Sequence, residues 1–381
     1  MAGFMRPGSE LTILLTLKDR VDYTARWMDY ASSVSFPFKV LIADGGSDDS
    51  VEGLLSGNPR YGSIDYEYIR YPQDRSYADY YAKIADALTR VETPYVAMAD
   101  NDDFFVVDSL RRSVSFLSEN PDYVACGGQG AIFWMHPEGR PHLYGGKIEW
   151  KCTLEPESIE AAAARERIRG QSISSSDTSY YDVKRSVEAK RQFEIVRSLD
   201  LTDLFLVENL VGFLTAVAGK TRRLEGLYLV RQHNAPASSG GTHQQQYGDW
   251  FGRMLVESWS RDFEKFVTVV SEDLAGADGI PLGEARQFVI DSYRMLVAPA
   301  LLSIILDEPT VTISMSAFVA SVRRLVRLPK DSRIRKLARF LYRRARWISL
   351  DCVYGTEILT TPVPNAGQDI GPILRFLARG Q

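Results

Sequence analysis

"PYVAMADNDDF", residues Pro94 to Phe104, joins a short apolar run to three carboxylates. The run has the length and composition of a buried β-strand. Asp100, Asp102 and Asp103 follow it directly. Carboxylates held this close repel one another, so they need water, an arginine or a metal ion between them. The stretch therefore predicts a strand that ends in a polar site.

The chain before this stretch alternates apolar runs with helical patterns. Predicted strands and helices follow one another at 11–17, 22–32, 39–44, 51–55, 65–71 and 76–91. Buried strands that alternate with helices are typical of a parallel sheet covered on both faces. We therefore predict an α/β fold.

Polar residues mark the carboxyl ends of these strands. Thr16 lies near the end of the first strand, and Asp44 ends the second and opens the turn "DGGSDDS". Gly45 in this turn would let a ligand approach the backbone closely. Ligands bind beyond the carboxyl ends of strands in such sheets, so we expect these residues and the Asp100 cluster to form one site.

The pattern is more varied after residue 104. Helices are predicted at 108–120 and 206–220, the second closed by Gly219, and strands at 123–135 and 222–234. The segment 155–191 is polar, and we predict a mobile or substrate-facing loop at "SISSSDTSYY" within it. Helical patterns dominate after residue 250.

Three common motifs for metal ions or phosphates are excluded. An EF-hand loop requires glycine at its sixth position, which here is Phe105. The first strand is followed by "TLKDR" rather than by a glycine-rich dinucleotide fingerprint, and the sequence contains no P-loop. A D-x-D type of site, which holds a divalent ion against a nucleotide diphosphate, remains.

Four segments in order resemble the inverting glycosyltransferases of family 2. They are "TLKDR", "IADGGSDDS", "TPYVAMADNDDF" and "ENLVGFLTAVAGK", and the resemblance covers about residues 11–234. Asp19 stands where the family usually has asparagine, and Val207-Glu208 where it has an acidic pair. The resemblance implies a GT-A-like, mostly parallel sheet with helices on both faces, followed by a helical C-terminal region.

The resemblance also implies roles for the polar residues. It implies that the nucleotide-sugar is bound by Thr16, Arg20, Asp44, Gly45, Lys83, Asp100 and Asn101. Asp44 would bind the base or ribose, and Lys83 would meet phosphate or Asp100. The structural alternatives are a turn aspartate that caps its own loop and an exposed lysine on a helix.

The ligands implied for Mn²⁺ or Mg²⁺ are Asp102, Asp103 and His233. Asp102 would be the main ligand, because these ions prefer hard oxygen donors. A lone histidine such as His233 is more often structural. For the general base, the resemblance implies Glu208, which lies where the family has its catalytic aspartate when counted back from Gly219, with Asp203 as the alternative. Each acid could instead stabilise the N-terminus of a helix.

The implied reaction is the transfer of a sugar from a nucleotide-diphospho-sugar to a hydroxyl of a glycan or lipid-linked acceptor, with inversion. Bacterial surface polysaccharide or glycolipid assembly is the pathway that we expect. Two alternatives stay open. A sugar-1-phosphate nucleotidyltransferase also uses aspartate-bound Mg²⁺, although it usually has a glycine-rich basic loop after the first strand. A non-catalytic carbohydrate-binding or scaffold protein could retain the fold.

We expect a GT-A-like domain over residues 1–248 and a helical region over 249–381. Within the domain, 11–103 would bind the nucleotide-sugar and 104–235 the acceptor. The Gly/Ser/Gln-rich loop 233–249 is predicted to be a lid that closes over the donor.

The net charge of −4 is unevenly distributed. Residues 321–350 contain eleven Lys/Arg and one acid, so this segment carries +10 and the remainder −14. The segment 331–350 has the pattern of a basic amphipathic helix, which would dock on an anionic membrane or pack on the acidic body. Nothing else in the sequence supports a nucleic-acid partner.

The cellular location is predicted from cysteines and from the N-terminus. Three widely spaced cysteines and the lack of an apolar leader favour the cytoplasm. If residues 331–350 dock on a membrane, the protein would be peripheral on its inner face.

Overall fold

The structure is a computed structural model. It describes residues 10–136, 143–153, 157–174, 179–235, 250–305, 349–352, 355–358 and 363–379. Within these residues, no helix combines the length and apolarity that a membrane span requires. The predicted membrane-docking segment 331–350 falls almost entirely outside the described residues, as does most of the predicted lid 233–249.

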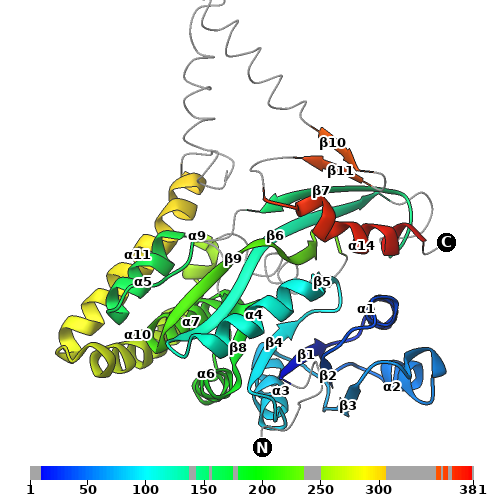
Figure 1. The fold of residues 1–381 in the computed structure, drawn as a ribbon. Helices are drawn as coiled ribbons and strands as arrows, with labels where there is room; N and C mark the ends of the chain where they lie inside the picture. The colour runs from blue at the N-terminus through cyan, green and yellow to red at the C-terminus, as the bar shows by residue number, and fades with distance from the viewer. Residues whose placement is uncertain are drawn as a thin grey trace, which may run out of the picture.

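The first four strands form the parallel part of the sheet (Figure 1). They are β1 (Leu11–Leu17), β2 (Lys39–Asp44), β3 (Tyr66–Arg70) and β4 (Tyr95–Ala99). Their order in space is β4-β1-β2-β3, and each neighbouring pair is parallel. The predicted alternation of strands and helices is therefore confirmed in this half of the domain.

Helices cover both faces of this sheet because alternate strand residues point to opposite sides. Leu14 and its neighbours pack under α3 (Tyr77–Thr89), α6 (Ser186–Leu199) and α7 (Leu204–Ala218). Ile13 points to the other face. That face is covered by α1 (Val21–Ser33), α2 (Ser50–Leu55), the short 3₁₀ helix η1 (Pro59–Tyr61) and α4 (Val107–Glu119).

The second half of the sheet is mixed. Its strands are β5 (Asp103–Phe105), β6 (Tyr123–His136), β7 (Lys147–Thr153), β8 (Val183–Arg185) and β9 (Lys220–Gln232). The short β8 lies between β4 and β6 and is antiparallel to both. β9 runs parallel to β6 and antiparallel to β5. The β5–β9 pairing brings the end of β9 next to the aspartate turn.

Much of the polar segment 155–191 is regular structure, and residues 175–178 of the predicted loop lie outside the described residues. It contains α5 (Ala164–Ser174), the 3₁₀ helix η2 (Ser179–Tyr181), β8 and the start of α6. Arg167 of α5 is buried and donates to the carbonyls of Ala216 and Val217, at 2.6 and 2.8 Å. These are carbonyls at the end of α7, which lack partners within their own helix. A polar sequence here therefore supports a packed helix.

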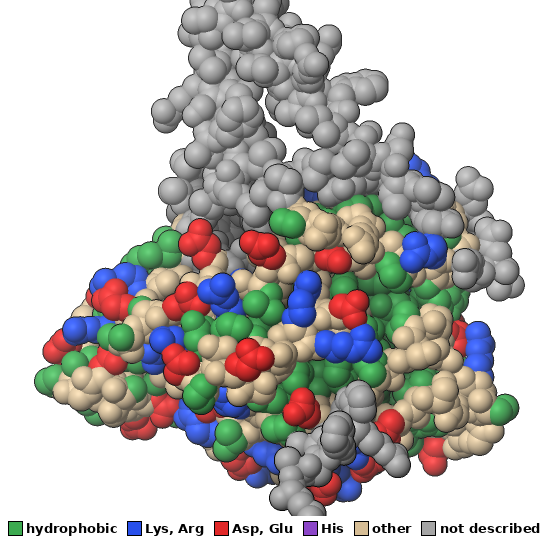
Figure 2. All heavy atoms as spheres, viewed as in Figure 1, with side chains coloured by type: hydrophobic (Ala, Val, Ile, Leu, Met, Phe, Trp, Pro, Cys, Tyr) green, Lys and Arg blue, Asp and Glu red, His purple; other side chains and the backbone are tan. Residues whose placement is uncertain are grey.

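The region 250–305 is largely helical, as predicted. It contains α9 (Trp250–Met254), α10 (Glu257–Asp278) and α11 (Leu282–Ile305), which lie together with α5 on the left of Figure 1. Phe266 of α10 and Tyr293 of α11 belong to the same core as α7. On the face shown in Figure 2, acidic and basic side chains are interspersed.

The end of the chain returns to the sheet. The strands β10 (Ser349–Cys352) and β11 (Gly355–Ile358) form a hairpin, and β11 pairs with β7. Helix α14 (Ala366–Arg379) packs beside β9 (Figure 1). The ring centroid of Phe376 lies 6.2 Å from that of Phe104, the residue after Asp103. The C-terminal helix thus supports the apolar side of the aspartate turn.

Candidate active site

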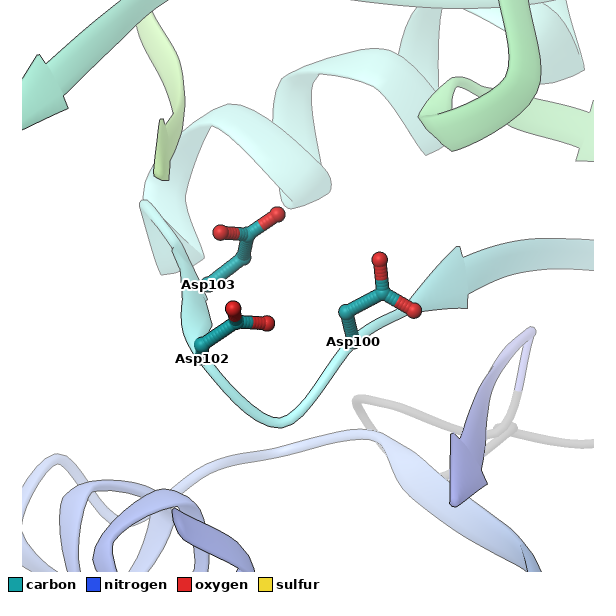
Figure 3. A group of neighbouring side chains, drawn as sticks. All are labelled: Asp100, Asp102 and Asp103. Atoms are coloured by element: carbon teal, nitrogen blue, oxygen red, sulfur yellow. The ribbon is translucent and has the colours of Figure 1, made fainter. Parts of the chain in front are cut away.

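Three carboxylates meet in the turn that joins β4 to β5. Figure 3 shows the side chains of Asp100, Asp102 and Asp103 around this turn. One carboxylate oxygen of each lies within 4.8 Å of the other two. Among the described residues, this is the group of acidic, histidine or cysteine side chains whose geometry could hold a metal ion. A set of hard oxygen donors at this spacing fits Mg²⁺ or Mn²⁺.

Each carboxylate has a partner from a different element. Arg20, which precedes α1, donates to Asp102 Oδ2 at 3.1 Å. Arg231 Nε of β9 donates to Asp103 Oδ2 at 2.8 Å. The third partner is the hydroxyl of Tyr181 in η2, which donates to Asp100 Oδ2 at 2.6 Å.

The pKa values of two of these carboxylates are raised. Burial raises the pKa of Asp103 to about 7, although the positive charge of Arg231 opposes this shift. Burial and the charge of Asp102 raise the pKa of Asp100. Raised values mean that the neighbouring arginines do not fully offset burial and mutual repulsion. Additional positive charge would stabilise the ionised cluster.

Arg26 contacts the backbone of the aspartate turn. Nothing in the sequence indicated this role. This α1 side chain has no exposed surface. Its Nη2 donates to the backbone carbonyl of Asp102 at 3.3 Å, and its Nη1 to Gln232 Oε1 at 2.7 Å. Burial lowers the pKa of its guanidinium to about 10. Arg26 thereby links the aspartate turn to the end of β9.

A pocket of about 130 Å³ lies beyond the ends of β1 and β2. Its lining includes Asp19, Arg20, Asp44, Gly46, Ser47 and Asp48. The Asp44 side chain is fully buried, and it accepts from Gly46 N and from the Tyr68 hydroxyl, both at 2.8 Å. In this structure Asp44 therefore shapes the turn, and its contact with a base or ribose stays a prediction.

Lys83 pairs with Asp74 instead of with Asp100. Its ammonium group is buried, forms an ion pair with the Asp74 carboxylate and donates to the carbonyl of Leu17 at 2.7 Å. Lys83 is thus not the exposed lysine of the structural alternative either. It joins α3 to the end of β1 beneath the pocket.

Thr16 and Asn101 also have internal partners. The Thr16 hydroxyl lies 2.8 Å from the Tyr80 hydroxyl. Asn101 Nδ2 donates to the Thr24 hydroxyl at 3.1 Å, which fastens the aspartate turn to α1. Both side chains are buried, so the structure gives them a role in positioning the site.

The two candidate bases differ in their surroundings. Asp203 caps α7 by accepting from Leu206 N at 2.8 Å, and it forms a buried ion pair with Arg253. Glu208 is half-buried in the second turn of α7. Burial raises the pKa of Tyr181 well above its usual value, and negative charges, including that of Glu208, raise it further. Helix α7, which carries Glu208, packs against η2, which carries the tyrosine that contacts Asp100.

A family model matches part of the chain. Residues 31–168 match the model described as "Glycosyl transferase family 2". This segment is therefore similar to the family 2 glycosyltransferases. The match includes the Asp44 turn and the aspartate cluster and ends before Glu208. The match agrees with the family resemblance of the sequence, and it covers residues 31–168 alone.

Solved structures of TarS from S. aureus are similar at low identity. TarS 1–349 in complex with UDP-GlcNAc is 11% identical, with 91% of this chain and 95% of that chain covered and a TM-score of 0.47. The same fragment with UDP is 12% identical, with the same coverage and a TM-score of 0.45. A further TarS structure is 12% identical with a TM-score of 0.42, and the match covers 76% of this chain. This chain spans about half, 55%, of that TarS chain. No curated protein matches the sequence.

His233 is not part of the carboxylate cluster. Its backbone N–H donates to the Phe133 carbonyl at 2.9 Å, which continues the pairing of β9 with β6. Its exposed ring packs edge-on against Trp134, with the centroids 5.2 Å apart. The group that could hold a metal among the described residues consists of three aspartates without His233, and its role as a ligand stays a prediction.

Gly45 is a testable feature of the turn that follows β2. A Cβ atom at this position would overlap the Asp74 carboxylate, which is fixed by Lys83. We expect Gly45→Ala to lower the free energy of unfolding by about 1–3 kcal/mol, because tight packing must give way. Gly53→Ala is the control, since a Cβ there meets no atom within 4 Å. Urea unfolding of both variants checks this prediction. A Gly45→Ala protein as stable as the Gly53→Ala protein would contradict the close packing at Gly45.

Proposed function

We propose that this glycosyltransferase moves a sugar from a nucleotide-diphospho-sugar to an acceptor hydroxyl, with inversion and with the help of Mn²⁺ or Mg²⁺. The observation that carries the proposal is the convergence of Asp100, Asp102 and Asp103 within 4.8 Å, inside the segment that matches family 2. The adjoining pocket at the ends of β1 and β2 would receive the nucleotide.

The aspartates would hold the ion, with Asp102 as the main ligand and Tyr181 orienting Asp100. A bound divalent ion would supply Lewis-acid stabilisation of the charge on the leaving diphosphate. The chain's part is to fix the carboxylates. Arg26 donates to the backbone of the aspartate turn, and α14 packs on the apolar side of the turn.

Glu208 would be the general base. It would take the proton from the acceptor hydroxyl as the oxygen attacks the sugar on the face opposite the diphosphate, so one displacement would invert the anomeric centre. Its half-buried position near Tyr181 favours this role. Asp203 is the less favoured candidate, because helix capping and Arg253 already engage its carboxylate.

The acceptor would be a glycan or a lipid-linked glycan in bacterial surface polysaccharide or glycolipid assembly. This part of the proposal rests on the family resemblance. Docking of the basic segment 331–350 on an anionic membrane would bring the enzyme to a lipid-linked acceptor. Binding to liposomes that rises with anionic lipid and falls with salt would support such docking.

The decisive experiment measures which product appears from a panel of nucleotide-sugars. The protein would be incubated with UDP-, GDP- and dTDP-sugars, Mn²⁺ and a lipid-linked glycan fraction. We expect release of one nucleoside diphosphate, and none from an Asp102→Asn protein. Pyrophosphate chemistry would instead indicate a nucleotidyltransferase. If no product is released from any donor, a non-catalytic protein would be favoured.

A further inference from the structure

Arg20 connects the two halves of the site. It lines the pocket at the ends of β1 and β2, together with Asp44 and Ser47. Its guanidinium also donates to Asp102 Oδ2 at 3.1 Å. Only 18% of the Arg20 side chain is exposed. The guanidinium of Arg20 thus contacts Asp102, a candidate metal ligand, and also lines the pocket proposed for the nucleotide.

The backbone at Arg20 is strained. Asp19 and Arg20 both have left-handed conformations, with φ of 58° and 61°. Such a conformation costs a residue other than glycine about 1–2 kcal/mol. Asp19 holds the turn by accepting from the backbone N–H and the hydroxyl of Ser47, at 2.6 and 2.7 Å. Strain of this kind persists where the surroundings enforce it, and it is often found at functional sites.

The guanidinium of Arg20 is only partly satisfied. Its Nε is buried and has no hydrogen-bond partner within the structure. Its central carbon lies over the ring of Tyr23, 4.2 Å from the centroid, and among carboxylates it pairs with Asp102. A buried N–H without an acceptor is unfavourable, and an anion in the pocket would supply one. Phosphate oxygens pair with guanidinium groups particularly well.

We propose that Arg20 is an exchangeable partner, bound to Asp102 in the free protein and to the diphosphate of the donor in the complex. The inference rests on the proposed function. A divalent cation on Asp102 would compete with the guanidinium for the same carboxylate, because the two positive charges repel one another. Arg20, displaced from Asp102, would then be free to pair with the diphosphate beside the pocket. It is a binding and positioning residue in this scheme, not a proton donor.

If Arg20 exchanges partners in this way, its replacement should strengthen the binding of Mn²⁺ and weaken the binding of the nucleotide. In Arg20→Met, Mn²⁺ alone should bind about threefold or more tightly, because its competitor on Asp102 is gone. UDP or GDP, measured in saturating Mn²⁺, should bind about tenfold or more weakly, which corresponds to 1.4 kcal/mol. Methionine keeps an apolar chain over Tyr23. Arg20→Lys keeps the charge, so its Mn²⁺ affinity should stay close to that of the wild type.

The test is calorimetric titration of the full chain with Mn²⁺ alone and then with each nucleotide. Arg191→Met is the matched control, because Arg191 lies on α6 and pairs with Glu188 and Asp273. It should change neither affinity. A wild type that binds no Mn²⁺ would overturn the proposed metal role, and the exchange with it. A wild type that binds Mn²⁺, with Arg20→Met binding it equally or more weakly, would overturn the exchange alone.

Discussion

Replacing Glu208 with glutamine is expected to lower turnover by about 10²–10⁴-fold, the usual contribution of a general base. Glutamine has nearly the same shape, but its amide cannot accept the proton of the acceptor hydroxyl. The affinity for nucleotide should stay nearly unchanged, because Glu208 lies on α7, away from the pocket at β1 and β2. Turnover with a donor and acceptor, and nucleotide titration of the same protein, check both parts.

Asp203→Asn is the matched control for this prediction. Asparagine can still cap α7, but it leaves Arg253 buried without its ionic partner. Breaking a buried pair in this way costs about 3–5 kcal/mol, so the effect should appear in the unfolding midpoint. Turnover at a temperature where the variant is folded should be close to normal. If the folded Asp203→Asn protein is inactive and Glu208→Gln is active, the base has been assigned to the wrong acid.

Asp102→Asn is expected to abolish detectable transfer and Mn²⁺ binding. The change removes one of three negative charges that converge within 4.8 Å and leaves Arg20 without its carboxylate. An amide is a much poorer ligand than a carboxylate for a hard divalent ion. Calorimetry with Mn²⁺ and an assay of nucleotide release measure the two effects. Excess EDTA should silence the wild-type protein in the same way.

The control for Asp102 is Asp122→Asn. Asp122 is an exposed acid that pairs with Lys220 at the edge of the sheet. Exposed ion pairs contribute about 0–1 kcal/mol, so this variant should bind Mn²⁺ and release nucleotide like the wild type. Full activity of the wild type in excess EDTA would exclude the metal role of Asp102.

The parallel half of the fold could be predicted because its signals are local. Each buried strand is a continuous apolar run, and Ser76 with Asp79 forms a capping box at the start of α3. The aspartate cluster was visible for the same reason, since its three members lie within four residues of one another. The helix within the polar segment 155–191 was not apparent from the sequence. Its polar side chains bond to distant backbone groups, as Arg167 does with the end of α7.

The partners of the cluster depend on contacts between distant residues. Asp103 lies opposite Arg231 because β5 pairs with β9 in one register. Tyr181 reaches Asp100 only because η2 folds beside β4. Sequence periodicity reports which face of an element is buried, but it does not report which element packs against that face. The sequence by itself thus determined the alternating strands and the acidic turn. The tertiary structure alone decided which cations and hydroxyls hold that turn, because sheet register and helix packing bring them together.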